Sequence, residues 1–574
     1  MSQEAPQHSA GYKWVVLSNT TLGMLAAAMN SSILLISLPA IFRGIHLDPL
    51  DPGNINYLLW AIIGYMIATA VLVVAFGRLG DQFGRARMYN LGFAIFTAAS
   101  IALALLPGKG DFAATYLIVV RMIQGVGGAL IMANSTALLT DAFSPDQRGL
   151  ALGINVVAAI GGQFVGLLLG GLLADYDWRL VFWINVPFGV VGTVWAYWRL
   201  SEIPNRRKHR IDWLGNASFG LGLVLVLTAI TYGIQPYGNE VMAWTSPKVV
   251  TLFGLGILAL VLFCLVEKRV ERPMLDFRLF GIAPFAYGNI ANLTSSIARG
   301  GLQFMLIIWL QGIWLPLHGY AFEITPLWSA IFMLPLTFGF LLASPVAGYF
   351  SDRVGGVPFA VGGMVFGAAS FVALMLLPAD FSYLAFAALL FLNGLGSGLF
   401  VAPNSTQIMN SVPPAERGQA SGMRATTTNA GQVLSIGVFF SLMLAGLAAT
   451  LPHAMEAGLL AQNVPAAVAG KIASMPPVAS LFAAFLGYNP MGELIPHSVL
   501  ASLPPQNVAA LTGTEFFPGL MSAPFKHGLI LAFTFSAILY LVAAFTSWKG
   551  GSIVVRESEA LDGPMQGQRV AQSA

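Results

Sequence analysis

Fourteen long apolar segments are the feature that most constrains this chain. A membrane-spanning helix needs about 20 mostly apolar residues, and short polar loops separate fourteen such stretches. Charged residues make up only 9% of the chain, whereas a soluble domain carries roughly 25%. Most of the chain is therefore expected to have lipid as its solvent. The candidate spans are 15–42, 57–79, 88–107, 116–143, 152–176, 181–200, 214–236, 249–267, 285–315, 327–350, 359–378, 383–412, 423–447 and 526–548.

The distribution of Lys and Arg sets the expected orientation. Cytoplasmic loops of membrane proteins carry an excess of these residues. An even number of spans puts both termini on one side, and the basic cluster of residues 206–210 lies on that side. The opposite side holds only Arg43, Lys109, Arg179, Lys248, Lys471 and Lys526. Both termini are therefore expected in the cytoplasm, in a multi-pass protein of the cell (inner) membrane.

Three pattern matches indicate an internal duplication. The pattern G-x-x-x-D-x-x-G at 77–84 recurs 271 residues later at 348–355. The pattern P-x-x-R-G-x-A-x-G recurs with an offset of 269, and the triplet Asn-Ser-Thr that begins at Asn134 recurs at Asn404 with an offset of 270. Spans 1–6 and 9–14 are thus expected to be related halves, as is common in transporters.

The expected organisation follows from these two observations. It comprises a cytoplasmic N-terminus (1–14), a first six-helix half (15–200), two inserted helices with cytoplasmic linkers (201–284), a second six-helix half (285–549) and a disordered cytoplasmic tail (550–574). The second half contains a long, Pro-rich extracytoplasmic loop at 448–525. Its best apolar run, Val478 to Leu486, is too short to cross a bilayer.

Several motifs resemble those of one transporter family. They are "GRLGDQFGRAR" after span 2, "RMIQGVGGA" in span 4 and "DWRLVFWINVPFG" before span 6, with Trp60 and Tyr65 in span 2. Together they are similar to the major facilitator superfamily, specifically its fourteen-span drug:proton antiporter branch. The resemblance implies an all-α fold of two six-helix halves plus two inserted helices. It also implies alternating access and export of amphipathic, drug-like or lipid-like small molecules.

The loop after span 2 is the candidate gate. A tight turn would explain Gly77 and Gly84, but it would not explain Asp81 and Arg85. In the family, the aspartate matching Asp81 caps a helix of the other half, where the helix dipole favours a negative charge. The arginine matching Arg85 bridges to an acid at the end of span 4, here Asp141. In the second copy of the motif, Asp352 takes the position of Asp81.

Two departures from the family pattern bear on proton coupling. Asn30 stands in span 1 where the branch usually carries Asp, and Leu167 stands where its span 5 motif usually carries Pro. None of the 25 acidic residues falls in the middle third of a predicted span. Any coupling to protons is therefore expected to be weaker than in relatives with the acid, or to run through Asp81 or Asp141.

Glycines recur in span 5 at every fourth residue, at Gly162, Gly166 and Gly170. This spacing places them on one helix face and allows another helix to approach closely. Tight packing explains the spacing on its own. The functional alternative is that the same face seals the extracytoplasmic side.

A polar stripe runs along span 9 through Asn289, Asn292, Ser296, Arg299 and Gln303, in steps of three and four residues. Such a stripe faces either a helix–helix hydrogen-bond seam or a wet cavity. With Arg121 in span 4, the membrane core would hold two fixed positive charges, which favours anionic or neutral substrates over cations. The predicted substrate cavity comprises Asn30, Tyr65, Arg121, Gln124, Asn134, Asn292, Arg299, Gln303, Asn404 and Gln432.

Other function classes fit the sequence poorly. It contains no metal-ligand spacing of the H-E-x-x-H type and no Walker A motif, so neither a metal, a cofactor nor an enzymatic activity is expected. The net charge of +3 is too small to suggest nucleic-acid binding. Two alternatives remain open: a uniporter or lipid or anion exporter not coupled to protons, and a non-transporting membrane sensor.

Overall fold

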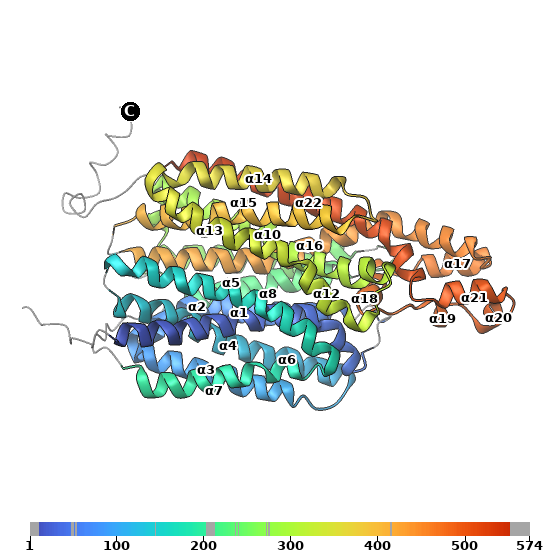
Figure 1. Ribbon diagram of the computed structural model, residues 1–574, viewed down its shortest axis with the longest axis horizontal. Helices are drawn as coiled ribbons and strands as arrows, with labels where there is room; N and C mark the ends of the chain where they lie inside the picture. The colour runs from blue at the N-terminus through green and yellow to red at the C-terminus, as the bar shows by residue number, and fades with distance from the viewer. Residues whose placement is uncertain are drawn as a thin grey trace, which may run out of the picture.

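The computed structural model is an all-helical bundle with an additional small group of helices at one end (Figure 1). It describes residues 11–47, 51, 54–143, 145–201, 213–235, 237–238, 240, 242–270, 273, 276–413 and 416–551. Within these residues, fourteen helices are long and apolar enough to cross a membrane. The predicted fold class and number of spans are therefore confirmed. Most of the predicted tail, and the basic cluster at 206–210, lie outside the described residues.

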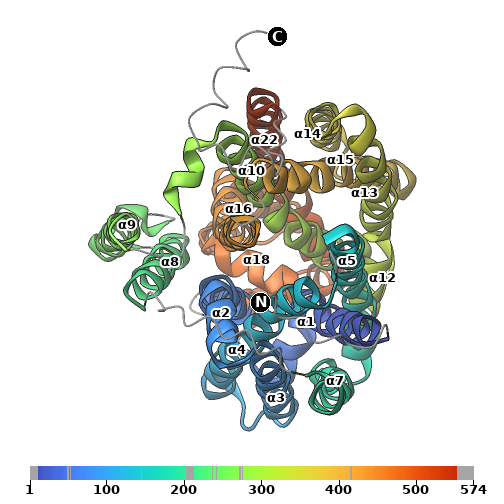
Figure 2. The same ribbon diagram turned by 90° about the vertical axis from the view of Figure 1, so that its left-hand side faces the viewer.

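The first half is formed by the six expected spans. They are α1 (Tyr12–Gly44), α2 (Ile55–Phe83), α3 (Arg85–Ala104), α4 (Gly110–Ala142), α5 (Pro145–Tyr176) and the pair α6 (Leu180–Trp183) and α7 (Asn185–Arg199). Helix α1 packs on α5, and α4 packs on both α2 and α3. The inserted helices α8 (Trp213–Gly233) and α9 (Pro247–Glu267) pack on each other beside the bundle (Figure 2).

The second half begins after α9 and repeats this arrangement. Its spans are α10 (Ala283–Trp309), continued by a π-helical turn η4 (Leu310–Trp314) and α11 (Leu315–Leu317), α12 (Thr325–Phe332) with α13 (Leu334–Val354), α14 (Gly356–Leu376), α15 (Tyr383–Asn410), α16 (Arg417–Ala461) and α22 (Phe516–Gly550). Helix α15 packs on α13 and α14, as α4 does on α2 and α3. Figure 2 shows the two halves as separate groups of helices.

Residues 448–461 are helical, whereas the sequence predicts a loop from residue 448. Helix α16 continues to Ala461 for 45 residues, a length of about 68 Å that exceeds the roughly 30 Å hydrocarbon core. Leu451, Met455 and Leu459 lie one turn apart and are buried, so an apolar stripe continues past Pro452. This packing keeps the segment helical despite the proline.

The remainder of the predicted loop forms a compact group of short helices, here called the cap subdomain. It consists of α17 (Ala466–Ala473), α18 (Pro477–Phe485), α19 (Met491–Leu494), α20 (His497–Leu500) and α21 (Pro505–Thr512). In Figure 1 most of it projects to the right of the bundle. We call this the cap end of the bundle and the opposite end, where α2 meets α3, the motif end.

The halves are held together at the cap end. Gln311 Nε2 of η4 donates a hydrogen bond of 3.2 Å to the carbonyl oxygen of Ile36 in α1. The guanidinium of Arg43 lies 4.8 Å from the ring centre of Phe322, and Gly171 of α5 packs against the backbone of Leu327 in α12. These contacts join α1 and α5 to the second half.

Candidate functional site

Two glycines form the tight turns at the motif end. Gly84 ends α2 with φ 108°, and Gly355 ends α13 with φ 93°. Residues with a side chain rarely adopt these values, so the turn explains Gly84 and its duplicate. Gly77 lies within α2, and a side chain added there would meet no atom within 4 Å. Space therefore does not require glycine at that position.

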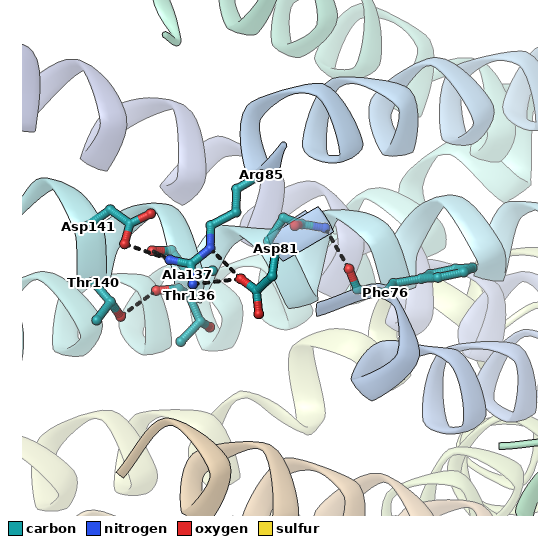
Figure 3. A network of polar contacts seen from close by, with 8 residues as sticks. Phe76, Asp81, Arg85, Thr136, Ala137, Thr140 and Asp141 are labelled. Carbon is teal, nitrogen blue, oxygen red and sulfur yellow. Dashed lines mark hydrogen bonds and ion pairs between the residues drawn. The ribbon is translucent and has the colours of Figure 1, made fainter. Parts of the chain in front are cut away.

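Arg85 bridges two carboxylates at the motif end (Figure 3). Its guanidinium lies 2.7 Å from Asp81 Oδ1 and 2.6 Å from Asp141 Oδ1, and its Nη1 also donates to the carbonyl oxygen of Ala137 at 3.2 Å. These side chains come from α2, α3 and α4. The ion pair between Arg85 and Asp141 expected from the resemblance is therefore present.

Asp81 differs from the expectation that it caps a helix of the other half. Among its described contacts, the carboxylate pairs with Arg85 of its own half. The reason lies in the conformation, since the halves meet at the cap end and not at the Asp81 end. The side chain of the duplicate, Asp352, lies outside the described part of the structure.

A buried polar network occupies the centre of the first half. Gln124 Oε1 accepts hydrogen bonds from Arg121 Nη1 at 2.7 Å and from Asn30 Nδ2 at 3.1 Å. Gln124 Nε2 donates to Ser100 Oγ at 2.8 Å, and Asn185 Nδ2 donates to Asn30 Oδ1 at 3.2 Å. All five side chains are buried. The network joins α1, α3, α4 and α7 without using a carboxylate.

The charge of Arg121 is stabilised by neutral groups. Its guanidinium carbon lies 4.5 Å from the ring centre of Tyr65, and Tyr65 donates to the carbonyl oxygen of Ala27 at 3.4 Å. Arg121 is 1% exposed, and its Nε has no hydrogen-bond partner among the described residues. An ion in such surroundings keeps much of its long-range field.

The second half contains a corresponding network at the same offset. Asn393 Nδ2 donates to Ser370 Oγ at 2.8 Å, which matches the bond between Gln124 and Ser100 with offsets of 269 and 270 residues. Arg299 stands 269 residues after Asn30. The position that carries a neutral amide in the first half therefore carries a positive charge in the second half.

Arg299 is half-buried among α10, α13 and α22. Its guanidinium carbon lies 5.8 Å from the ring centre of Phe340 and is close enough to Tyr540 for electrostatic interaction. The hydroxyl groups of Tyr540 and Ser397 are 3.0 Å apart and share a hydrogen bond. In the part of the chain that the structure describes, Arg299 has no carboxylate partner.

Part of the polar stripe on span 9 forms a seam between α10 and α16. Asn292 Nδ2 donates to the hydroxyl groups of Thr428 at 2.8 Å and Thr427 at 3.0 Å. The Oγ1 of Thr427 donates to Asn289 Oδ1 at 3.4 Å, and Ser296 packs against Gly431. The seam alternative is therefore correct for this stretch, and the cavity prediction for Asn292 is wrong.

Asn134 and Asn404 also lie in helix seams, in contrast to the cavity prediction. Asn134 is fully buried, donates to the carbonyl oxygen of Leu130 at 2.9 Å and lies against Gly80. Asn404 Nδ2 donates to the carbonyl oxygen of Gly288 at 3.2 Å. Amides saturate such seams because lipid offers no hydrogen bonds.

Two further predicted cavity residues are half-buried. The backbone of Gln432 in α16 packs against Gly300 of α10, and Gln303 lies one turn beyond Arg299. An apolar hollow of about 640 Å³ near the motif end does not coincide with the predicted cavity. Its lining comprises Trp14, Val15, Leu17, Ser18, Thr21 and Ile154.

The glycine face of α5 packs directly on α1. Side chains added at Gly162 or Gly166 would collide with the carbonyl oxygens of Leu25 and Met29, and one at Gly170 would lie 2.7 Å from that of Ile33. The close approach predicted from the spacing is therefore present.

Sequence reasoning missed Ser100, Asn185, Ser370, Asn393, Ser397 and Tyr540. Each is a single polar residue within an apolar span, which is an ordinary occurrence. The duplication carried a usable signal, because Ser100 and Gln124 match Ser370 and Asn393 at the offset of the motifs.

Comparison with known proteins places the chain in a family. The model of the Major Facilitator Superfamily matches residues 20–436. The riboflavin transporter RibZ of Clostridioides difficile is 28% identical, with 76% of this chain and 89% of that protein covered. The tetracenomycin C resistance and export protein of Streptomyces glaucescens is 29% identical, with 82% and 84% covered.

A solved structure supports the same fold. A bacterial homologue of the human lysosomal transporter Spinster superimposes with a TM-score of 0.57, over 95% of this chain and 99% of that one, at 15% identity. The resemblance drawn from the sequence motifs is thus confirmed. This chain belongs to the major facilitator superfamily, whose members are membrane transporters and not enzymes.

Proposed function

We propose that this protein is a secondary active transporter that exports an amphipathic, anionic or neutral small molecule across the cell membrane by alternating access. Arg299 is the observation that carries the substrate preference. It is a half-buried arginine in the membrane domain without a carboxylate partner among the described residues. An arginine at the bilayer centre costs about 2.5–3.5 kcal/mol on insertion scales, so a function that uses its charge explains its presence.

The two core arginines take different roles in this proposal. Arg121 is enclosed by Tyr65 and Gln124, so it acts through its field. Arg299 lies beside Phe340, and its guanidinium is free to bind an acidic group while the ring contacts an apolar part of the substrate. Export as the direction is supported by the printed function of the tetracenomycin C relative.

The gate proposal rests on the motif end, which the sequence predicts to be cytoplasmic. Arg85, Asp81 and Asp141 tie α2, α3 and α4 together there, which allows the first half to move as one body. We assign a gating role to this group, with its duplicate around Asp352 in the second half.

The experiment compares Arg299→Gln with the native protein in proteoliposomes. The substrates are a lipophilic carboxylic acid and its neutral amide, which have almost the same shape. We expect the variant to lose at least tenfold in transport of the acid and less than threefold for the amide. Efficient native transport of a permanent cation, unaffected by Arg299→Gln, would contradict the proposed preference.

A carrier without proton coupling is the second candidate. It is favoured by the network around Asn30, which holds amides, a hydroxyl and an arginine but no titratable acid. A non-transporting sensor would bind the acid without moving it, so the same proteoliposome assay separates the sensor from both carriers.

A further inference from the structure

Helix α18 is a nine-residue apolar helix that is buried at the cap end. All of its residues, Pro477–Phe485, are buried, and the chain bends by 84° between α17 and α18. Nine helical residues span about 14 Å, less than half of the hydrocarbon core. The helix therefore cannot cross the membrane, and its burial comes from packing on other helices.

The contacts of α18 involve both halves. On the side of the first half, the ring of Phe482 lies edge-on to that of Phe42 in α1, with ring centres 5.9 Å apart. On the side of the second half, the ring of Phe485 lies edge-on to that of Phe304 in α10, also at 5.9 Å. Figure 2, which looks along the bundle, shows α18 between the two groups of helices.

The second half holds α18 more firmly than the first. Gly312 of η4 leaves room for the α18 backbone, since a side chain there would lie 2.7 Å from the carbonyl oxygen of Ala484. Helix α18 also packs on α16 and α22, and the cap subdomain connects it covalently to both. Its contacts with the first half are the Phe42 ring and α2.

Alternating access requires the halves to separate at the cap end in the opposite state. A helix that contacts both halves must then release one of them. We propose that α18 is a plug that closes the pathway at the cap end, travels with the second half and releases Phe42 when that end opens. This inference rests on the proposed transport function and adds its gate at the cap end.

The burial of Ser480 is consistent with a plug that opens. Its hydroxyl group is fully buried and has no hydrogen-bond partner among the described residues. An unsatisfied buried hydroxyl costs about 1–3 kcal/mol, and this cost is removed when water reaches the plug.

Two matched pairs of cysteines test the plug. The single native cysteine, Cys264, is first changed to serine. One variant then carries Phe42→Cys with Phe482→Cys, and the other carries Phe304→Cys with Phe485→Cys. Because the ring distances are equal, the same short, reducible bifunctional thiol reagent serves for both pairs. We expect the cross-link between Phe42 and Phe482 positions to lower transport at least tenfold, reversibly on reduction, and the other cross-link to leave more than half.

The outcomes separate the plug from the transport function. Normal transport with the first pair cross-linked would overturn the plug, and loss with both pairs would overturn its attachment to the second half. If neither reduced variant transports, the transport proposal fails, and spin labels on the same positions then test the plug alone. The 42–482 distance should show a second, longer population while the 304–485 distance stays single. One population for both pairs would overturn the plug.

Discussion

At the scale of single residues, the motif end shows how one arginine serves two acids. Arg85 contacts Asp81 and Asp141 within the first half. All three side chains are about 30% exposed, so each ion pair is partly screened and contributes little to stability by itself. Its importance lies in the difference between conformations, because a ligand or charge shifts an equilibrium only by its differential interaction with the two states.

Asp81→Asn tests this difference. In the present conformation, Arg85 would keep Asp141 as a partner, so the loss of Asp81 costs little. In a state closed at the motif end, the loss removes a charge that can cap a helix of the other half, worth about 0.3–1 kcal/mol. We expect the population open at the motif end to rise about two- to fivefold relative to the closed one.

Spin-label distances between the motif ends of α2 and α13 would measure the shift caused by Asp81→Asn. The matched control is Asp111→Asn, which removes an exposed carboxylate in the first turn of α4 at the other end. Unchanged distances in Asp81→Asn would end the gating proposal.

At the scale of helices, the contact between α1 and α5 depends on the absence of side chains. Gly162, Gly166 and Gly170 lie against carbonyl oxygens of α1. Without a hydrophobic driving force in lipid, such helices associate through close packing. The same α5 then reaches α12 through Gly171 at the cap end, so α5 connects the packing of the first half to the contact between halves.

Gly162→Val is expected to destabilise the protein, because the new side chain must displace the backbone of Leu25. Overpacking of this kind costs about 1–3 kcal/mol. The neighbouring Gly161 is the control, since a side chain there meets no atom within 4 Å. Thermal unfolding of the two purified variants in detergent measures the effect. Equal melting temperatures for Gly162→Val and Gly161→Val would show that the packing is not tight.

At the scale of the whole molecule, the two halves carry different charges at equivalent positions. The hydroxyl–amide pairs of Ser100 with Gln124 and of Ser370 with Asn393 are preserved. Asn30 and its counterpart Arg299 differ in charge. The duplication therefore kept the polar framework, while the charged position moved from one half-site to another. Substrate binding at Arg299 and proton coupling at Asn30 are separable on this basis.

Asn30→Asp is expected to create or strengthen proton coupling. The new carboxylate would lie in the network of Gln124 and Asn185, where Arg121 is one residue away through Gln124. In proteoliposomes, a pH gradient should drive the variant at least threefold more strongly than the native protein. The native protein should respond weakly, and strong pH-driven transport by a variant without both Asp81 and Asp141 would contradict this account of coupling.

The sequence by itself determined the features that repeat along the chain. Span number follows from runs of about 20 apolar residues, which lipid requires. The duplication follows from Gly84 and Gly355, where a turn with positive φ admits only glycine readily. The close face of α5 follows from glycine spacing, because helical periodicity is a local property. These predictions needed no knowledge of which segments meet.

The tertiary structure alone decided which polar residues face one another. The stripe on α10 has the spacing of a cavity lining, yet Asn292 is taken up by Thr427 and Thr428 from 135 and 136 residues away. The run at α18 is too short to span a membrane, yet both halves bury it. Periodicity reveals that a face is polar or apolar, but the partner that satisfies it comes from a distant segment, and only the packing of the halves brings that segment into place.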